Sequence, residues 1–170
     1  MKLRLLLLAV FVSSIATAVV TLAAVVIANR ASADLAGFNY WSAKELKGYE
    51  KPLHEKVSGP NKTSSIKLAD YGSSNVSISH REANGIPEVH AQMGDYFVVE
   101  SGEATLIIGG EVVNAKTVEP GETRGDSIKG GERRKLTTGD VVHIPTDMPH
   151  QLLVESSKPF TYFVIKVKAK

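Results

Sequence analysis

Two short groups of residues in the second half of the chain have side chains suited to chemistry. His90, Gln92 and Asp95 lie within six residues of one another, and His150 follows further along the chain. Imidazole nitrogens and carboxylate oxygens bind divalent transition metals, so these residues form a candidate metal site. Two histidines and one carboxylate match a facial-triad iron site, and Zn, Mn, Ni, Co and Cu are also compatible with such ligands. Gln92 is either a weak fourth ligand or a donor that orients water or substrate.

The residues around these ligands alternate between apolar and polar with the period of a β-strand. Gly, Pro, Asn and Ser separate the runs, and no repeated helix lies between them, so the sequence predicts an all-β barrel or jelly roll with the site in its mouth. On an extended strand His90 and Gln92 face the same side, and residues 93–94 offer a turn that brings Asp95 back toward them. We expect strands near residues 66–68, 76–80, 96–99, 105–108, 112–113, 141–144, 151–154 and 160–167.

The first group resembles the first motif of the cupin superfamily. That motif has a His-x-His pair, a Glu and, after an aromatic-aliphatic strand, a Gly. The chain has His90-Ala-Gln-Met-Gly-Asp95 and then Tyr-Phe-Val-Val-Glu-Ser-Gly102. It departs from the family pattern at Gln92, which stands for the second histidine, and at Asp95, which stands for the glutamate.

The second group resembles the second cupin motif, Gly-x5-Pro-x-Gly-x2-His. Residues Gly139 to His150 match it, except that Asp147 stands where the family usually has glycine. The resemblance covers roughly residues 65 to 167. It implies a single cupin-type jelly-roll barrel, or double-stranded β-helix, with a divalent metal at its mouth. It also implies isomerase, lyase or dioxygenase chemistry and a possible homodimer.

Three further side chains are candidates for the pocket. His80 shares its strand phase with apolar neighbours and is expected either to point toward the pocket or to be a buried histidine with satisfied hydrogen bonds. His143 precedes Pro145 and is expected to pack or to line the mouth. Tyr96 is a strand aromatic that fills the core or floors a pocket. His54, on an expected helix, is predicted to be solvated.

The first 33 residues have the pattern of an export signal. Lys2 and Arg4 form a positive start, residues 5–28 are almost wholly apolar, and residues 31–33 read Ala-Ser-Ala, a small-residue cleavage pattern. The alternative is an uncleaved anchor, because the apolar run is long enough to span a bilayer. Both interpretations predict an exported protein, periplasmic, secreted or anchored by this segment. The absence of cysteine is consistent with that location.

The charge of the chain gives no electrostatic footprint for nucleic acid. Three of its 20 basic residues, Lys2, Arg4 and Arg30, lie in the first 33 positions, so the rest carries 17 basic and 18 acidic side chains. A nearly neutral domain is not expected to bind nucleic acid, and residues 133–135 (Arg-Arg-Lys) are too short a run to change that prediction.

The remaining sequence divides into an N-terminal segment, 34–64, and a barrel, 65–170. Ser42 and Glu45 form a capping-box pattern, and Leu46, Tyr49 and Leu53 recur at helical spacing, so a helix is expected from residue 42 to about 57, lying as a strap across the barrel. Residues 114–135 are rich in Gly and charge and are expected to form a long loop or lid.

Two functions are compatible with these features. The first is a small metalloenzyme whose substrate is a small acid or sugar-like molecule. The alternative is a noncatalytic barrel that captures such a ligand, which the replacement of a ligating histidine by Gln92 favours. One fold hosts many functions, so the fold by itself does not separate the two.

Overall fold

The computed structural model describes residues 37–155 and 158–169. Residues 42–170 form one compact unit, and the expected export segment, 1–33, lies outside the described residues. In the part of the chain that is described, no helix has the length and apolar character needed to cross a membrane.

The described residues form two short helices and thirteen strands. The helices are α2 (Ala43–Gly48) and α3 (Glu50–Glu55). The strands are β1 (Thr63–Asp70), β2 (Ser74–Arg81), β3 (Glu88–His90), β4 (Met93–Ser101), β5 (Glu103–Ile108), β6 (Glu111–Val113), β7 (Lys116–Glu119), β8 (Glu122–Arg124), β9 (Ser127–Lys129), β10 (Glu132–Thr137), β11 (Val141–Ile144), β12 (His150–Leu153) and β13 (Phe160–Lys168).

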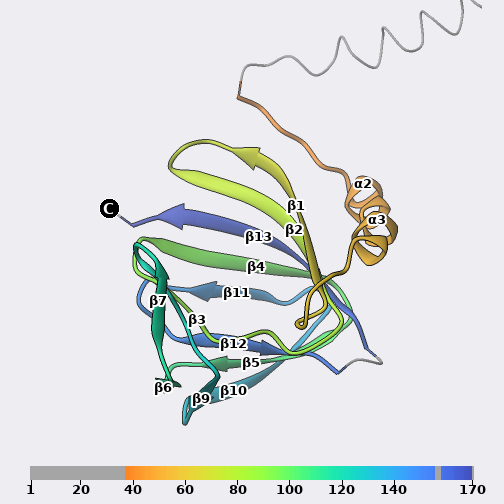
Figure 1. Ribbon diagram of the computed structural model, residues 1–170. Helices are drawn as coiled ribbons and strands as arrows, with labels where there is room; N and C mark the ends of the chain where they lie inside the picture. The colour runs from red at the N-terminus through yellow and green to blue at the C-terminus, as the bar shows by residue number, and fades with distance from the viewer. Residues whose placement is uncertain (1–36, 156–157, 170) are drawn as a thin grey trace, which may run out of the picture. The chain divides into compact units, whose positions relative to one another are not determined.

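The strands build two main antiparallel sheets and a two-stranded ribbon (Figure 1). One sheet has the order β1-β2-β13-β4-β11, the other has the order β10-β5-β12-β3-β8-β7, and β6 pairs with β9. The buried apolar cluster draws side chains from both sheets, including Phe97 and Val164 from the first and Leu106 and Leu152 from the second. Burying the inner faces of two sheets against each other is the organisation of a jelly roll, and it confirms the predicted fold class.

The N-terminal strap consists of two helices, where the sequence pattern predicts one. The capping box is present, with the Ser42 Oγ accepting from the Glu45 amide and the Glu45 carboxylate accepting from the Ser42 amide. The first helix stops at Gly48 because Pro52 has no N–H to donate to the Gly48 carbonyl. Leu53 is fully buried, as the apolar stripe predicts, and its carbonyl accepts a 2.6 Å hydrogen bond from Ser64 of β1.

The face of β2 that the sequence predicts to point toward the pocket is the outer face of the barrel in the structure. Val76, Ile78 and His80 are buried, but they lie on the outer face, beside α3, and are not part of the barrel's apolar cluster. The side chains that face the cavity between the sheets are Ser77, Ser79 and Arg81. Because α3 covers the outside of this strand, apolar alternation does not by itself identify the barrel interior.

The expectation of a long loop over residues 114–135 is wrong. This segment forms β7, β8 and β9 and the beginning of β10, and β8 pairs with β3 at the centre of the site. Its polar composition follows from exposure: every residue of β7 is exposed, and β10 buries only Leu136. The basic triplet at 133–135 is therefore exposed, as expected, but on a strand.

Candidate metal centre

Pairing between neighbouring strands assembles a charged site from residues far apart in the sequence. Three pairs lie directly opposite one another in the two sheets: Glu88 with His150, His90 with Glu122, and Asp95 with Lys166. Side chains of directly opposed residues are close enough to interact, so strand register determines which groups meet.

Two imidazole nitrogens and two carboxylates converge at the centre of this site. The Nε2 atom of His90 is 3.5 Å from both Glu88 Oε2 and Asp95 Oδ2, and the Nε2 atom of His150 is 3.7 Å and 3.8 Å from the same two oxygens. Both histidines and Asp95 are buried. The ligand atoms of Glu88, His90 and His150 all lie within 4.8 Å of one another.

Hydrogen bonds on the far side of each imidazole direct its Nε2 atom into the site. His90 Nδ1 is 2.7 Å from Glu122 Oε2, and His150 Nδ1 is 3.0 Å from the Met148 carbonyl oxygen. Because both partners accept, Nδ1 carries the proton in each ring. The Nε2 atom of His150 is the one buried side-chain nitrogen or oxygen, among the described residues, that has no hydrogen-bond partner.

These groups fit a divalent metal ion. Metal–nitrogen and metal–oxygen bonds of about 2.0–2.2 Å place neighbouring ligand atoms roughly 3–3.5 Å apart. Each imidazole Nε2 atom here lies at a similar or slightly longer distance, 3.5 to 3.8 Å, from the Glu88 and Asp95 oxygens. An outer acceptor on Nδ1 is the usual way to orient a metal-binding histidine. A cation would also satisfy the orphaned Nε2 of His150, whose burial without a partner is otherwise costly.

Lys166 contacts the same atoms that a metal would need. Its Nζ lies 2.7 Å and 2.9 Å from the two Asp95 carboxylate oxygens and 3.0 Å from His90 Nε2. In the absence of a metal, this ammonium therefore supplies the positive charge that the buried carboxylate requires.

The electrostatic environment keeps both carboxylates ionised at neutral pH. Burial alone would raise the pKa of Glu88, but the nearby imidazoles of His150 and His90 and the charge of Arg124 hold it well below its usual range. Burial likewise opposes ionisation of Asp95, and contact with His90 and Lys166 lowers its pKa. Ionised carboxylates are the form that binds metals.

His90 gives the metal-free protein a specific dependence on pH. Burial alone would lower its pKa, but Asp95 and Glu88 outweigh this effect and raise it from 6.5 to about 9. A pKa raised in the folded state stabilises the fold fully below the unfolded value and loses that contribution as pH rises through the folded value. With a chelator present, we expect the melting temperature to fall between about pH 6.5 and 9. The His90→Gln variant should show a flatter profile over this range; parallel profiles in melting scans would contradict the assignment.

The two carboxylates of the candidate metal site, Glu88 and Asp95, border a cavity between the two sheets. It has a volume of about 180 Å³, and its lining includes Glu88, Asp95, Tyr162 and Arg81. Nε of Arg81 donates a 3.0 Å hydrogen bond to the Tyr162 hydroxyl. Among the described residues, no carboxylate oxygen lies within 4.0 Å of the Arg81 guanidinium. Arg81 therefore has no direct ion pair beside the cavity, and Glu88 acts on it at longer range: burial alone would lower the Arg81 pKa, but the Tyr162 hydroxyl and the charge of Glu88 raise it.

The structure brings three of the four predicted ligands together and leaves Gln92 outside. Strand β3 ends at His90 and residues 91–92 form a bend, so the alternation that predicts a shared face for His90 and Gln92 does not apply. Gln92 is exposed and lies beside Gly121. Asp95 reaches the site from within β4, on the opposite sheet, and not through a turn.

The three predicted pocket residues lie on outer surfaces of the barrel. His143 is exposed and stacks on Tyr96, which lies opposite it on β4, with ring centroids 4.5 Å apart. His80 is buried, as expected, and its Nδ1 is 2.8 Å from Thr161 Oγ1 on the outer face of the sheet. Its expected alternative role in the barrel pocket is not supported.

The substitution of Asp147 in the second motif has a conformational explanation. Asp147 has φ of 60°, in the left-handed region that favours glycine. Aspartate is one of the few other residues that tolerate this conformation. Its amide donates a 2.9 Å hydrogen bond to the His90 carbonyl, so the loop before His150 remains tied to the other motif.

The motif interpretation misses three members of the site: Glu88, Glu122 and Lys166. Glu88 is two residues before His90 on β3, so the period of two places both on one face. Lys166 follows Tyr162 and Val164 at the same period, and a lysine in phase with buried residues is a detectable signal. Glu122 could not be found this way, because its position depends on the pairing of β8 with β3.

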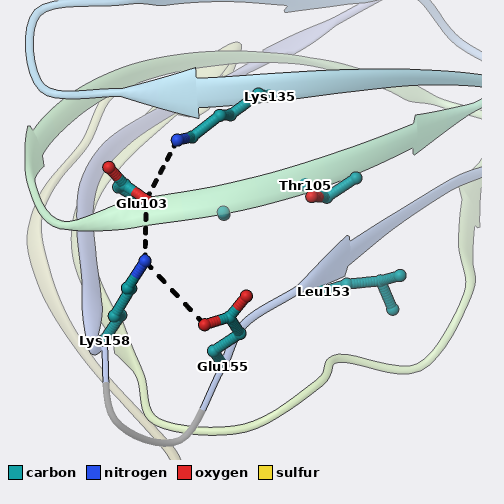
Figure 2. Close-up of a pocket in the computed structure, with 7 residues that line it drawn as sticks. Glu103, Thr105, Lys135, Leu153, Glu155 and Lys158 are labelled. Atoms are coloured by element: carbon teal, nitrogen blue, oxygen red, sulfur yellow. Dashed lines mark hydrogen bonds and ion pairs between the residues drawn. The ribbon is translucent and has the colours of Figure 1, made fainter.

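A separate hollow of about 250 Å³ lies on the surface around β5 and β10 (Figure 2). Its charged side chains neutralise one another: Glu103 pairs with Lys135 at 3.2 Å and with Lys158 at 3.4 Å, and Lys158 also approaches Glu155 at 3.9 Å (Figure 2). Exposed ion pairs of this kind contribute little to stability. Contact with Lys135 and Lys158 lowers the pKa of Glu103, which keeps this carboxylate ionised and paired. The buried centre between the sheets is the stronger candidate.

Comparisons with known proteins identify the fold. No family model matches the chain, and no curated protein matches it by sequence. Among solved structures it resembles a protein from Bacillus halodurans, with a TM-score of 0.54, 13% identity, and coverage of 81% of this chain and 86% of the other. A Klebsiella pneumoniae protein with a double-stranded β-helix domain gives a TM-score of 0.52 and 16% identity, covering 78% and 87% of the two chains. A cupin protein from Bacteroides fragilis gives a TM-score of 0.46 and 21% identity, covering 69% and 85%.

The chain therefore has a double-stranded β-helix fold, the fold that the resemblance of its two sequence motifs implies. Within that fold it carries a buried group of histidines and carboxylates that could hold a metal.

Proposed function

We propose that this protein is an exported cupin that binds a divalent transition metal through His90, His150, Glu88 and Asp95. The observation that carries the proposal is the buried Nε2 atom of His150, which has no partner and lies within 3.8 Å of two carboxylates. The candidate metals remain Fe, Zn, Mn, Ni, Co and Cu, since ligands of this type discriminate weakly among them.

The substrate we propose is a small acid, and Arg81 supports this choice over a sugar-like substrate. The guanidinium has no carboxylate partner within 4.0 Å in the described structure, and it borders the same cavity as Glu88 and Asp95. Arginine is suited to bidentate binding of a carboxylate. The cavity, at about 180 Å³, is smaller than the usual pocket for a drug-sized ligand, so it fits a compact molecule.

The reaction we propose belongs to the isomerase, lyase or dioxygenase type. A bound metal would polarise an oxygen of the substrate or activate dioxygen. In this arrangement Arg81 would hold the acid group, and Glu122 would keep the His90 ring in its binding orientation.

The alternative is a noncatalytic barrel that binds a small ligand. One observation favours it: the Lys166 ammonium already neutralises Asp95 without a metal, through contacts of 2.7 Å and 2.9 Å. In that case Arg81 and Lys166 together would present two cationic groups to a ligand in the cavity.

Elemental analysis of the purified chain, followed by melting scans with small carboxylic acids and with polyols of similar size, tests the proposal. We expect close to one equivalent of metal in the barrel site and a melting temperature that rises with carboxylates but not with polyols. Arg81→Gln should abolish the carboxylate effect, and Arg81→Lys should retain part of it because the charge is kept. Stabilisation by polyols alone would contradict the acid assignment, and carboxylate stabilisation without any metal would favour the noncatalytic barrel.

A further inference from the structure

A second group of potential metal ligands lies outside the barrel. His54 of α3, His80 of β2 and Glu82, just after β2, place their ligand atoms within 4.8 Å of one another. His54 Nδ1 is 2.5 Å from Glu82 Oε1, and His80 Nε2 is 3.4 Å from the same oxygen. The two imidazole rings are perpendicular to each other, with centroids 6.1 Å apart.

The position of each side chain follows from the local structure. Glu82 lies in the bend just after β2, and its carboxylate turns toward His80, with Oε1 3.4 Å from the His80 Nε2 atom. His80 is on the outer face of the sheet, and α3 lies against that face and brings His54 alongside. Ser79 and Arg81, the neighbours of His80, face the barrel cavity. This group is therefore separated from the barrel centre by the thickness of the sheet.

We propose that His54, His80 and Glu82 form a second divalent-metal site, which fixes helix α3 to the outer face of β2. Two imidazoles and one carboxylate are a ligand set that zinc accepts, with water completing the coordination. Nickel and copper also suit imidazole ligands. This proposal does not depend on a metal in the barrel.

Two features of the group favour a metal over a simple hydrogen-bonded cluster. His80 is buried and its Nδ1 is 2.8 Å from Thr161 Oγ1, which fixes the ring with Nε2 directed at the other two residues. The His80 to Glu82 contact is longer than a good hydrogen bond, so this carboxylate does not fully satisfy the buried Nε2. The His54 side chain is 67% exposed, so an ion can reach it from solvent.

The site would tie together two segments that share few other polar contacts. Residues 54 and 82 are far apart in the sequence, and α3 buries only Leu53. A metal that binds only the folded arrangement adds its binding free energy to the docking of the helix. The proposed role is therefore to stabilise the strap formed by α2 and α3.

Zinc titration of the whole chain, produced without a polyhistidine tag and stripped with a chelator, tests this proposal by stoichiometry. With both sites present, we expect two equivalents for the unmodified protein and one for His54→Ala, whose exposed position makes misfolding no concern. Glu55→Ala, an exposed carboxylate on the same helix outside the group, is the matched control and should still bind two equivalents.

The His150→Ala background separates this site from the barrel centre. There we expect one equivalent of zinc, which is lost when His54→Ala or Glu82→Gln is added. If the unmodified protein binds one equivalent that is sensitive to His54→Ala and not to His150→Ala, the outer site stands and the barrel site fails. If His54→Ala changes neither the stoichiometry nor the affinity in either background, the outer site is overturned.

Discussion

The His150→Ala variant is expected to lose at least about 100-fold in zinc affinity at the barrel centre. Removing an outer partner of a metal ligand already costs 10–100-fold, and a direct ligand should cost more. His150 has a further role, because its Nδ1 is anchored to the Met148 carbonyl and its Nε2 is aimed into the site without any other partner. Competition titration against a chromophoric chelator measures the change.

His143→Ala is the matched control for this measurement. Both histidines belong to the second motif, but His143 is exposed and stacks on Tyr96 on the outer surface. Its removal should leave the affinity of the barrel centre unchanged. Equal losses of zinc affinity in the two variants would show a general effect on folding. An unchanged affinity in His150→Ala would contradict the proposal that the barrel centre binds the metal.

The fold could be predicted from sequence because alternation and turn residues are local signals. Short apolar runs separated by Gly and Pro give the strands directly, and the capping box at Ser42 marks the true start of a helix. The strands within residues 114–135 cannot be predicted in this way, because their sequence lacks these local signals. Strands β7 and β10 lie at exposed edges, and the short inner strand β8 consists of polar residues, so nothing in their composition distinguishes them from a loop.

The site could be predicted only in part, because its members are defined by pairing across strands. His90, Asp95 and His150 are recognisable from motif spacing alone. Glu122 meets His90 only because β8 is placed opposite β3, a register that no local pattern encodes. Gln92 is the opposite case. Alternation predicts that it shares a face with His90, but the bend at residues 91–92 places it outside the site.

The sequence predicts the wrong face of β2 as the interior lining of the barrel, for a physical reason. Alternation separates two faces but does not say which of them is the barrel interior. Val76 and Ile78 are buried outside the barrel's apolar cluster, and the polar face with Ser79 and Arg81 lines the cavity. A ligand-binding cavity requires polar side chains on its lining. The position of the polar face of β2 inside the barrel therefore agrees with the proposed function.

The Lys166→Met variant is expected to destabilise the metal-free protein by about 3 kcal/mol, because removal of one partner strands a buried charge. Asp95 is 1% exposed, and Lys166 contacts both of its carboxylate oxygens. The same variant should bind zinc more tightly, since the ammonium no longer competes for Asp95 and for His90 Nε2. Urea denaturation in the presence of a chelator measures the first effect, and zinc titration measures the second.

The combination of lower stability without metal and higher affinity with it is specific to Lys166 acting as an internal substitute for a cation. Lys168→Met, an exposed lysine at the end of the same strand, should change neither quantity. If Lys166→Met weakened zinc binding, Lys166 would have to support the bound state, and the ammonium could not be the group that the metal displaces. If the variant lost stability without gaining affinity, the charge pair would be a permanent part of the barrel, as the noncatalytic alternative requires.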